Sequence, residues 1–129
     1  MTQQLPNMPS PSLLNNLPHG IRFQQGWHAG LIGWIIRQHG LYYAKHWQLG
    51  AQFEAMVAEG LGAFMQRYNP EHDCLMSLWL ESDVIASLSL DGGHDRVAED
   101  GARVRFVIID EKWQSHGLGT LLMGATMEF

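Results

Sequence analysis

The residues of this chain best suited to chemistry lie near its end, where an apolar run from Ala102 to Ile109 leads into a short polar turn. The turn contains Gly117 and Gly119 and is followed by the apolar start of a helix. A turn of this kind exposes unpaired backbone N–H groups, and the helix adds the positive end of its dipole. The pattern therefore favours an anion site, usually for a phosphate. The residues predicted to form it are Gln114, Ser115, His116, Gly117, Leu118 and Gly119.

Other interpretations of the same glycines remain open at the level of sequence. The glycines could do no more than shape a strand-to-helix turn. A Rossmann fingerprint would have glycine where this chain has Leu122, and the Gly-Lys-Ser/Thr of a P-loop is absent from the sequence. His116 could contact a phosphate or equally point into solvent. The residues alone thus support an anion-binding turn and no particular ligand.

Neither metal binding nor nucleophilic catalysis has a recognisable residue pattern here. Seven histidines are present, but no two are four residues apart, which is the spacing of a helical zinc site. The one cysteine, Cys74, begins an apolar run and has no His–Asp set to mark it as a nucleophile. We therefore predict no metal site, and a buried apolar role for Cys74.

Hydrophobic periodicity predicts the elements that position the turn. Residues 1–19 contain four of the five prolines and no periodic pattern, which indicates a flexible N-terminal arm. The run Ile21–Gln24 alternates as a half-buried strand does. A helix is expected from Trp27, with Gly40 interrupting it before a second short helical turn. A clearer amphipathic helix follows over Ala51–Arg67.

The C-terminal half is predicted to be β-structure. Cys74–Glu81 is a nearly continuous apolar run, and Val84–Leu90 follows a tight turn with alternating apolar and serine residues. After a polar loop comes the last strand, Ala102–Ile109, in which regular alternation would place Val104 and Phe106 on one face. The predicted order β-α-α-β-β-β-α corresponds to an α/β (α+β) fold with helices packed on a mostly antiparallel sheet.

Composition limits the class of protein. The 129 residues are the length of one domain, and 46% hydrophobic residues with five Trp exclude a disordered chain. A net charge of −5 with eight Lys and Arg argues against a nucleic-acid partner. No apolar run approaches the ~20 residues of a membrane span, so no membrane partner is expected. One cysteine permits no intrachain disulfide, and no signal-peptide pattern is present, which favours the cytoplasm.

The turn and the elements before it together resemble the GCN5-related N-acetyltransferase (GNAT) superfamily. Its signature, Gln/Arg-x-x-Gly-x-Gly/Ala after a strand, is matched by residues 114–119, and the order of upstream elements matches too. The helical region is similar to the acetyltransferase half of MarR–GNAT fusion proteins. Their Arg-His-Gly-x-Leu-Tyr pattern is matched in part by Arg37-Gln38-His39-Gly40-Leu41-Tyr42, the next helix by Phe53-Glu54-Ala55, and the fourth strand by Arg105. By this resemblance, residues 20–129 form the N-terminal part of an acetyltransferase domain.

The resemblance implies an acetyl-CoA-dependent N-acetyltransferase that acylates an amine of unknown identity by direct attack. The turn would hold the pyrophosphate, and the pantetheine arm would pair with the backbone of Ile108 and Ile109. On the acceptor side, Glu54 is the catalytic candidate, for binding an amine or activating water. A solvated helix face is the competing interpretation for Glu54, and no other general acid or base is indicated.

This chain departs from the family pattern in several places. Glu111 replaces the proline common before the loop and brings a negative charge near the pyrophosphate, and Ser115 replaces a frequent glycine. The chain stops after Phe129, before the family's fifth strand and the elements that usually supply a tyrosine acid. We therefore expect a truncated domain whose exposed fourth strand another copy could cover in a homo-oligomer. The alternative function is a non-catalytic remnant that binds CoA, phosphate or a partner chain.

Overall fold

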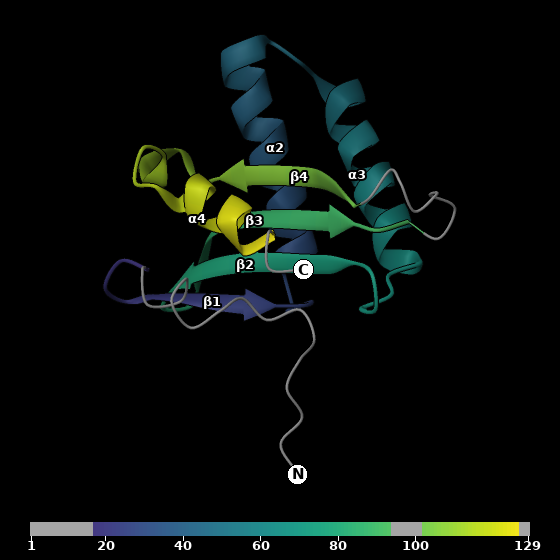
Figure 1. Cartoon of the computed structure of the whole chain (residues 1–129). Helices are drawn as coiled ribbons and strands as arrows, with labels where there is room; N and C mark the ends of the chain where they lie inside the picture. The colour runs from purple at the N-terminus through teal and green to yellow at the C-terminus, as the bar shows by residue number, and fades with distance from the viewer. Residues whose placement is uncertain (1–16, 94–101, 127–129) are drawn as a thin grey trace.

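The computed structural model describes residues 17–93 and 102–126, which form an antiparallel sheet with helices on both faces (Figure 1). Most of the predicted arm and all of the polar loop at 94–101 lie outside the described residues. The sheet has four strands in the order β1-β2-β3-β4. The strands are β1 (Ile21–Gln25), β2 (Cys74–Leu80), β3 (Asp83–Asp91) and β4 (Arg103–Ile109).

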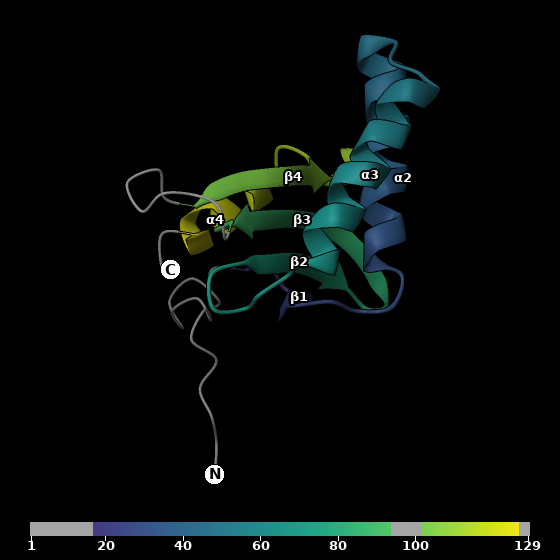
Figure 2. The same ribbon diagram turned by 90° about the vertical axis from the view of Figure 1, so that its right-hand side faces the viewer.

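Helices cover the sheet from two sides. The view in Figure 2 shows α2 and α3 next to one another on one face and α4 on the other. The order along the chain confirms the predicted β-α-α-β-β-β-α arrangement and the α+β fold class. Among the described helices, none has the length and apolar character to cross a membrane. The helices are α2 (Leu31–Trp47), α3 (Ala51–Gln66), the short 3₁₀ helix η2 (Glu111–Trp113) and α4 (Leu118–Thr126).

The central strand β2 is apolar except for Ser77, because both of its faces are covered. Cys74, Met76 and Leu78 lie on the side of α4, and Leu75 lies in the cluster formed with α2 and α3. Cys74 is fully buried, as predicted, and burial raises the pKa of its thiol to about 12. The thiol is therefore an inert core group at neutral pH.

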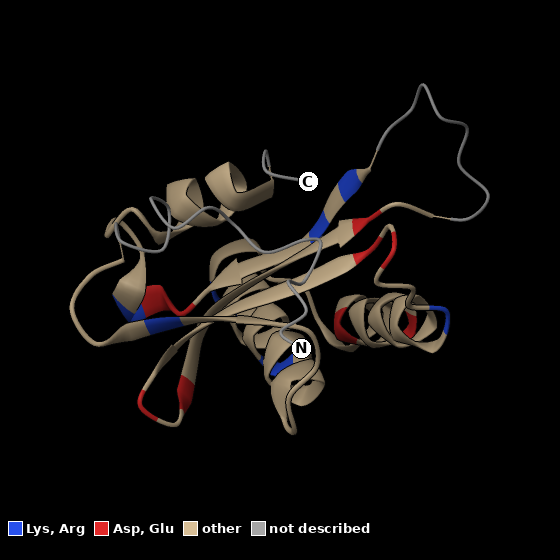
Figure 3. Ribbon diagram, turned by 60° about the horizontal axis from the view of Figure 1, so that its bottom comes forward, with Lys and Arg blue, Asp and Glu red and all other residues tan. Residues whose placement is uncertain are grey.

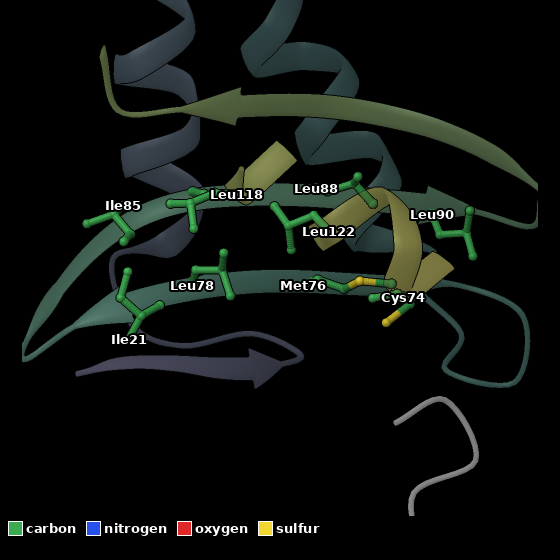
Figure 4. Close-up of a cluster of buried hydrophobic side chains, with 11 residues drawn as sticks. Ile21, Cys74, Met76, Leu78, Ile85, Leu88, Leu90, Leu118 and Leu122 are labelled. Atoms are coloured by element: carbon green, nitrogen blue, oxygen red, sulfur yellow. The ribbon is translucent and has the colours of Figure 1, made fainter. Parts of the chain in front are cut away.

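Helix α4 is attached to the sheet through one apolar face. Leu118 and Leu122 lie one helical turn apart and enter the cluster above β2 and β3, as Figure 4 shows. Both side chains are almost completely buried, and each contributes about 2 kcal/mol of transfer free energy. This packing fixes where α4 begins, and it therefore fixes the position of the turn before it.

Helix α2 continues without interruption through Gly40, so the predicted break is wrong. A side chain at residue 40 would overlap the carboxylate of Glu54 in α3. Gly40 therefore leaves room for the Glu54 carboxylate, and the helix tolerates the glycine's propensity cost of about 1 kcal/mol. The helix also begins later than predicted, because Trp27 lies in the preceding loop with 59% of its surface exposed.

Helix α3 begins where the predicted amphipathic helix begins and ends one residue before its predicted end, so this prediction is confirmed. Val57, Leu61 and Phe64 form its buried stripe. Met56, beside Val57 in the same helix, is 61% exposed. It borders a groove between α3 and β4 that Arg105 and Phe106 also line.

Strand β4 contains a β-bulge at Phe106, whose φ of 56° is uncommon for an aromatic residue. The register with β3 shifts at this point, between Ser87 and Ser89. The extra residue interrupts side-chain alternation. Val104 consequently packs on the α4 side, whereas Phe106 packs on the side of α2 and α3. The prediction that both side chains share one face is wrong.

A buried polar cluster lies at the end of the sheet where β4 begins, and Figure 3 shows acidic and basic segments of the ribbon near one another there. Asp91, 1% exposed, accepts hydrogen bonds of 2.7 Å from Arg67 and Arg105. Burial alone would raise the pKa of Asp91, but the two arginine hydrogen bonds outweigh it and lower the pKa. Asp73, also buried, accepts the backbone N–H of Gly92. This Asp91 cluster (Arg67, Asp73, Asp91 and Arg105) ties α3 to the ends of β3 and β4.

Candidate functional site

A cleft of about 460 Å³ lies at the other end of β4 from the Asp91 cluster. Its walls come from the C-terminal half of α2, the end of β4, η2 and the turn into α4. The last three of these segments follow one another in the sequence, and the fold brings the distant α2 beside them. We call this space the loop cleft. Its lining residues are Tyr42, Tyr43, Val107, Ile108, Ile109, Trp113, Gln114, Ser115, Gly117, Leu118, Gly119 and Thr120.

The turn before α4 leaves a run of backbone N–H groups unpaired. Ser115 and Gly117 have positive φ values, 68° and 81°. Left-handed residues that alternate with right-handed ones turn neighbouring N–H groups towards one side. The first helical bond of α4 joins the N–H of Leu121 to the carbonyl of Gly117. Within the described residues, no acceptor takes the N–H groups of residues 115–120, which is the geometry of an anion site.

Gln114 differs from the other residues predicted for the anion site. Its backbone N–H already bonds to the carbonyl of Glu111, so it is not one of the free donors. Its side-chain amide donates to the carbonyl of Ile109 at 3.2 Å. This bond ties the turn to the end of β4, and Gln114 therefore positions the free N–H groups that follow it.

The two glycines of the turn meet different requirements. Gly117 has open space around its α-carbon, so its positive φ is what calls for glycine. Gly119 lies in the first turn of α4, where an added methyl carbon would come 3.2 Å from Cδ1 of Ile109. Gly119 therefore allows α4 to pack closely on β4. The short helix-to-strand distance keeps the unpaired N–H groups beside the end of the strand.

The ring of His116 is held at the edge of the turn. Its Nδ1 lies 3.1 Å from the carbonyl oxygen of Trp113 and 3.0 Å from that of Gln114. A carbonyl oxygen can only accept, so the proton is assigned to Nδ1. The ring packs beside Trp113 with centroids 5.2 Å apart. Nε2 makes no hydrogen bond to a described residue, so it is open to solvent or to an anion.

The end of β4 presents backbone groups at an open edge. In the described part of the sheet, β4 pairs only with β3. The N–H of Asp110 bonds to Ile85 of β3, and successive residues direct their backbone groups to opposite edges. The backbone of Ile109 therefore faces the open edge, whereas that of Ile108 faces β3. The carbonyl of Ile109 already accepts a hydrogen bond from the Gln114 side chain, so the backbone N–H of Ile109 is the group left for a ligand.

Two bases from α2 offset the negative charge of Glu111. Lys45 Nζ lies 3.1 Å and His46 Nε2 2.9 Å from Oε2 of Glu111. The hydrogen bond from Lys45, and then that from His46, lowers the pKa of this exposed carboxyl. The contact joins the last turn of α2 to η2, where basic residues also suit the helix dipole. Glu111 is therefore compensated locally, despite its departure from the family pattern.

Tyr42 and Tyr43 form an aromatic wall of the loop cleft. The Tyr43 ring packs against Phe53 at 4.9 Å, and the Tyr42 ring packs against His46 at 4.4 Å. The site predicted from the turn motif did not include these tyrosines. Nothing in their sequence spacing points to the turn, because they approach it only through the packing of α2 beside β4.

The structure does not bring Glu54 together with the turn. Glu54 lies in the first turn of α3 with its carboxylate against Gly40, and it does not line the loop cleft. Glu59 borders a separate groove of about 370 Å³, with Arg105 and Phe106. We call this space the α3–β4 groove. Across residues 17–93 and 102–126, no three His, Cys, Asp or Glu side chains group closely enough to hold a metal ion.

Comparison with known proteins gives a clear result at the level of structure. No protein-family model and no curated protein matches the sequence. The chain is similar to a solved GCN5-related N-acetyltransferase from Ralstonia eutropha JMP134, with a TM-score of 0.60 and 14% identity over 85% of this chain and 76% of that one. The chain has a GNAT-like fold. A possible acetyltransferase from Clostridium difficile 630 is also similar, with a TM-score of 0.56 and 11% identity.

The GNAT-like fold covers most of the chain but not all of these structures. The likeness to the Clostridium difficile protein spans 80% of this chain and 66% of that one. At such low identities the likeness concerns the fold and does not extend to substrates or residue roles. Any functional assignment therefore depends on the residues of the loop cleft.

Proposed function

We propose that this chain is an acetyl-CoA-dependent N-acetyltransferase that acylates an amine by direct attack. The observation that carries the proposal is the run of unpaired N–H groups at residues 115–120, beside the open edge of β4 in a GNAT-like fold. A pyrophosphate is an anion that suits such a turn, and an extended amide arm suits a strand edge. The loop cleft offers both next to one another.

Each wall of the loop cleft has a role in this proposal. The N–H groups of residues 115–120 would bind the pyrophosphate. The free N–H of Ile109 would bond to a pantetheine carbonyl, and Tyr42 and Tyr43 would cover the apolar part of the arm. Acetyl-CoA supplies a thioester carbonyl as the electrophile when it is bound. Lys45 and His46 keep Glu111 from repelling the phosphates.

We propose a relation to the acetyltransferase half of MarR–GNAT fusion proteins, on the ground of the segment Arg37–Tyr42. We also propose that the reaction takes place in a reducing compartment, the cytoplasm, on the ground of the single buried thiol of Cys74. The acceptor is an amine whose identity the chain does not specify.

Calorimetric titration with acetyl-CoA tests the proposed site. We expect saturable binding at one site per chain, and much weaker binding of acetyl-pantetheine, which lacks the pyrophosphate. A thiol-release assay with a panel of primary amines then tests transfer. Equal affinity for the two thioesters would show that the turn does not bind the pyrophosphate. The absence of any acetyl-CoA binding would refute the proposed function.

A second candidate is a non-catalytic CoA- or partner-binding domain. The observation that favours it is the open edge of β4, with backbone groups available for another strand. A second copy pairing there would give a homo-oligomer. Acetyl-CoA binding without thiol release, together with a concentration-dependent dimer in analytical ultracentrifugation, would support this candidate over the enzyme. A stable monomer with a cooperative thermal transition would contradict it.

A further inference from the structure

His39 is a buried histidine at the centre of α2 whose surroundings are aromatic. It is 6% exposed. Its ring stacks on Tyr43 with centroids 6.1 Å apart and planes 9° apart, and it meets the edge of Phe106 at 6.4 Å and 78°. An apolar side chain would fill this space as well, so the presence of an imidazole calls for an explanation.

One hydrogen bond sets the tautomer of His39. Nδ1 lies 2.8 Å from the backbone carbonyl of Ile35, one helical turn earlier. Because a carbonyl only accepts, the proton is assigned to Nδ1, which leaves the lone pair of the neutral ring on Nε2. Nε2 has no partner among the described residues. Unlike the sealed and unpartnered Nε2 of His28, it is also reached by solvent.

The His39 ring packs against one residue of each of two spaces that a two-substrate reaction could use. Tyr43, on which it stacks, lines the loop cleft. Phe106, which it meets edge-on, is the bulged residue of β4 and lines the α3–β4 groove. The imidazole itself lines neither space: it lies behind Tyr43 at the proposed acetyl-CoA site and behind Phe106 at the unassigned groove.

We propose that His39 is the general base of the acetyltransferase, accepting a proton at Nε2 from an amine that enters through the α3–β4 groove. The proposal rests on the acetyltransferase function proposed above. In the transfer, the amine nitrogen forms a bond to the carbonyl carbon, the carbon–sulfur bond breaks, and the amine loses one proton. His39 Nε2 accepts that proton and then passes it to the departing thiolate, which leaves as a thiol.

The charged and titratable groups around His39 leave the ring neutral. They are Tyr43 on its own helix, Glu54 of α3 against the adjoining Gly40, and Arg105 of β4 stacked on Phe106 at 4.6 Å. Burial lowers the pKa of His39 below its usual 6.5, and the bond to the Ile35 carbonyl offsets this only in part. The ring is therefore unprotonated and able to accept a proton at neutral pH.

The test compares His39→Gln with a matched control, His19→Gln, at an exposed position before β1. Acetyl transfer is measured with methylamine and hydroxylamine, small amines that any acceptor site admits, and acetyl-CoA binding is measured by calorimetry. We expect His39→Gln to bind acetyl-CoA as the wild type does but to lose about 100-fold or more in kcat/KM. It should also lose the acidic limb of the pH–rate profile, which the control variant keeps.

A second measurement does not depend on activity or on a variant. Long-range ¹H–¹⁵N spectra of the wild-type imidazoles report which ring nitrogen carries the proton and at what pH the ring titrates. We expect His39 to show Nδ1–H and an unprotonated Nε2 down to a pH below 6.5. An Nε2–H tautomer, or full turnover by His39→Gln, would overturn the role of His39 alone. A wild type that binds no acetyl-CoA would overturn the proposed function and the base together.

Discussion

The two ends of β4 differ in how their polar groups are satisfied. At its beginning, Arg105 bonds to the buried Asp91, which also binds Arg67, so that opposite charges meet inside the protein. At its end, the strand leads into a turn whose N–H groups at residues 115–120 have no acceptor in the described residues. At the first end opposite charges pair with one another, although Oδ1 of Asp91 has no partner among the described residues, whereas the second end leaves donors for a ligand.

This difference separates residues that hold the fold from residues that would hold a ligand. Buried charges that pair with one another stabilise only as a set, and removal of one member leaves an uncompensated charge. Unpaired donors at a helix N-terminus cost little while water reaches them, and they bind an anion without rearrangement. Substitutions at the first end should therefore change stability, and substitutions at the second should change binding.

The largest effect is expected at the Asp91 cluster. Asp91→Ala leaves Arg67 and Arg105 without their shared acceptor, and we expect a loss of about 3 kcal/mol in the free energy of unfolding. Urea unfolding followed by fluorescence measures the change. The affinity for acetyl-CoA in the folded fraction should not change. A variant as stable as the wild type would show that the cluster does not hold the end of the sheet.

Glu111→Gln is the matched control, because Glu111 also binds two bases but is exposed. We expect no measurable shift of its urea midpoint. Acid provides an independent check on Asp91. The pKa of Asp91 is lower in the folded state than the usual 3.8. Its contribution to the free energy of unfolding is therefore fully present above pH 3.8 and is lost as the pH falls through the folded pKa. Wild-type stability should therefore fall more steeply below about pH 4 than that of Asp91→Ala.

The next effect in size is expected at the turn. Gly117→Val places a β-branched side chain at a φ of 81°, a strained conformation, which should turn the neighbouring N–H groups away from the anion. We expect about a 100-fold loss of acetyl-CoA affinity by calorimetry, equivalent to two lost charge-assisted hydrogen bonds.

Gly62→Ala is the control for this variant, since Gly62 lies in α3 with open space around it and a helical backbone. It should bind acetyl-CoA normally and gain up to about 1 kcal/mol of stability. If Gly117→Val bound acetyl-CoA as tightly as Gly62→Ala, the unpaired N–H groups would have no role in binding.

The smallest effect is expected from the tether between strand and turn. Gln114→Met keeps the length of the side chain but cannot donate to the carbonyl of Ile109. One neutral hydrogen bond is worth about 1 kcal/mol, so we expect roughly a 5-fold loss of acetyl-CoA affinity. Calorimetry at matched folded concentrations measures it. A larger loss than that of Gly117→Val would mean that Gln114 contacts the ligand directly.

The order of the elements and the place of the turn follow from the sequence by itself. The apolar runs of β2 and β3 and the stripe of α3 have periods that local chemistry sets, and the glycines at 117 and 119 mark the strand-to-helix turn. These features depend on residues close together in the chain, and the structure confirms the strands, the helices and their order.

Only the tertiary structure decided the features that depend on contacts between distant segments. Gly40 lies within a helix that packs beside α3, and the alternation of β4 changes at Phe106 because a bulge inserts one residue. Tyr42 and Tyr43 join the turn, and His39 packs against Phe106 of β4, for the same reason. Local propensity cannot specify such placements, since their free energy comes from packing and pairing that exist only after the sheet has formed.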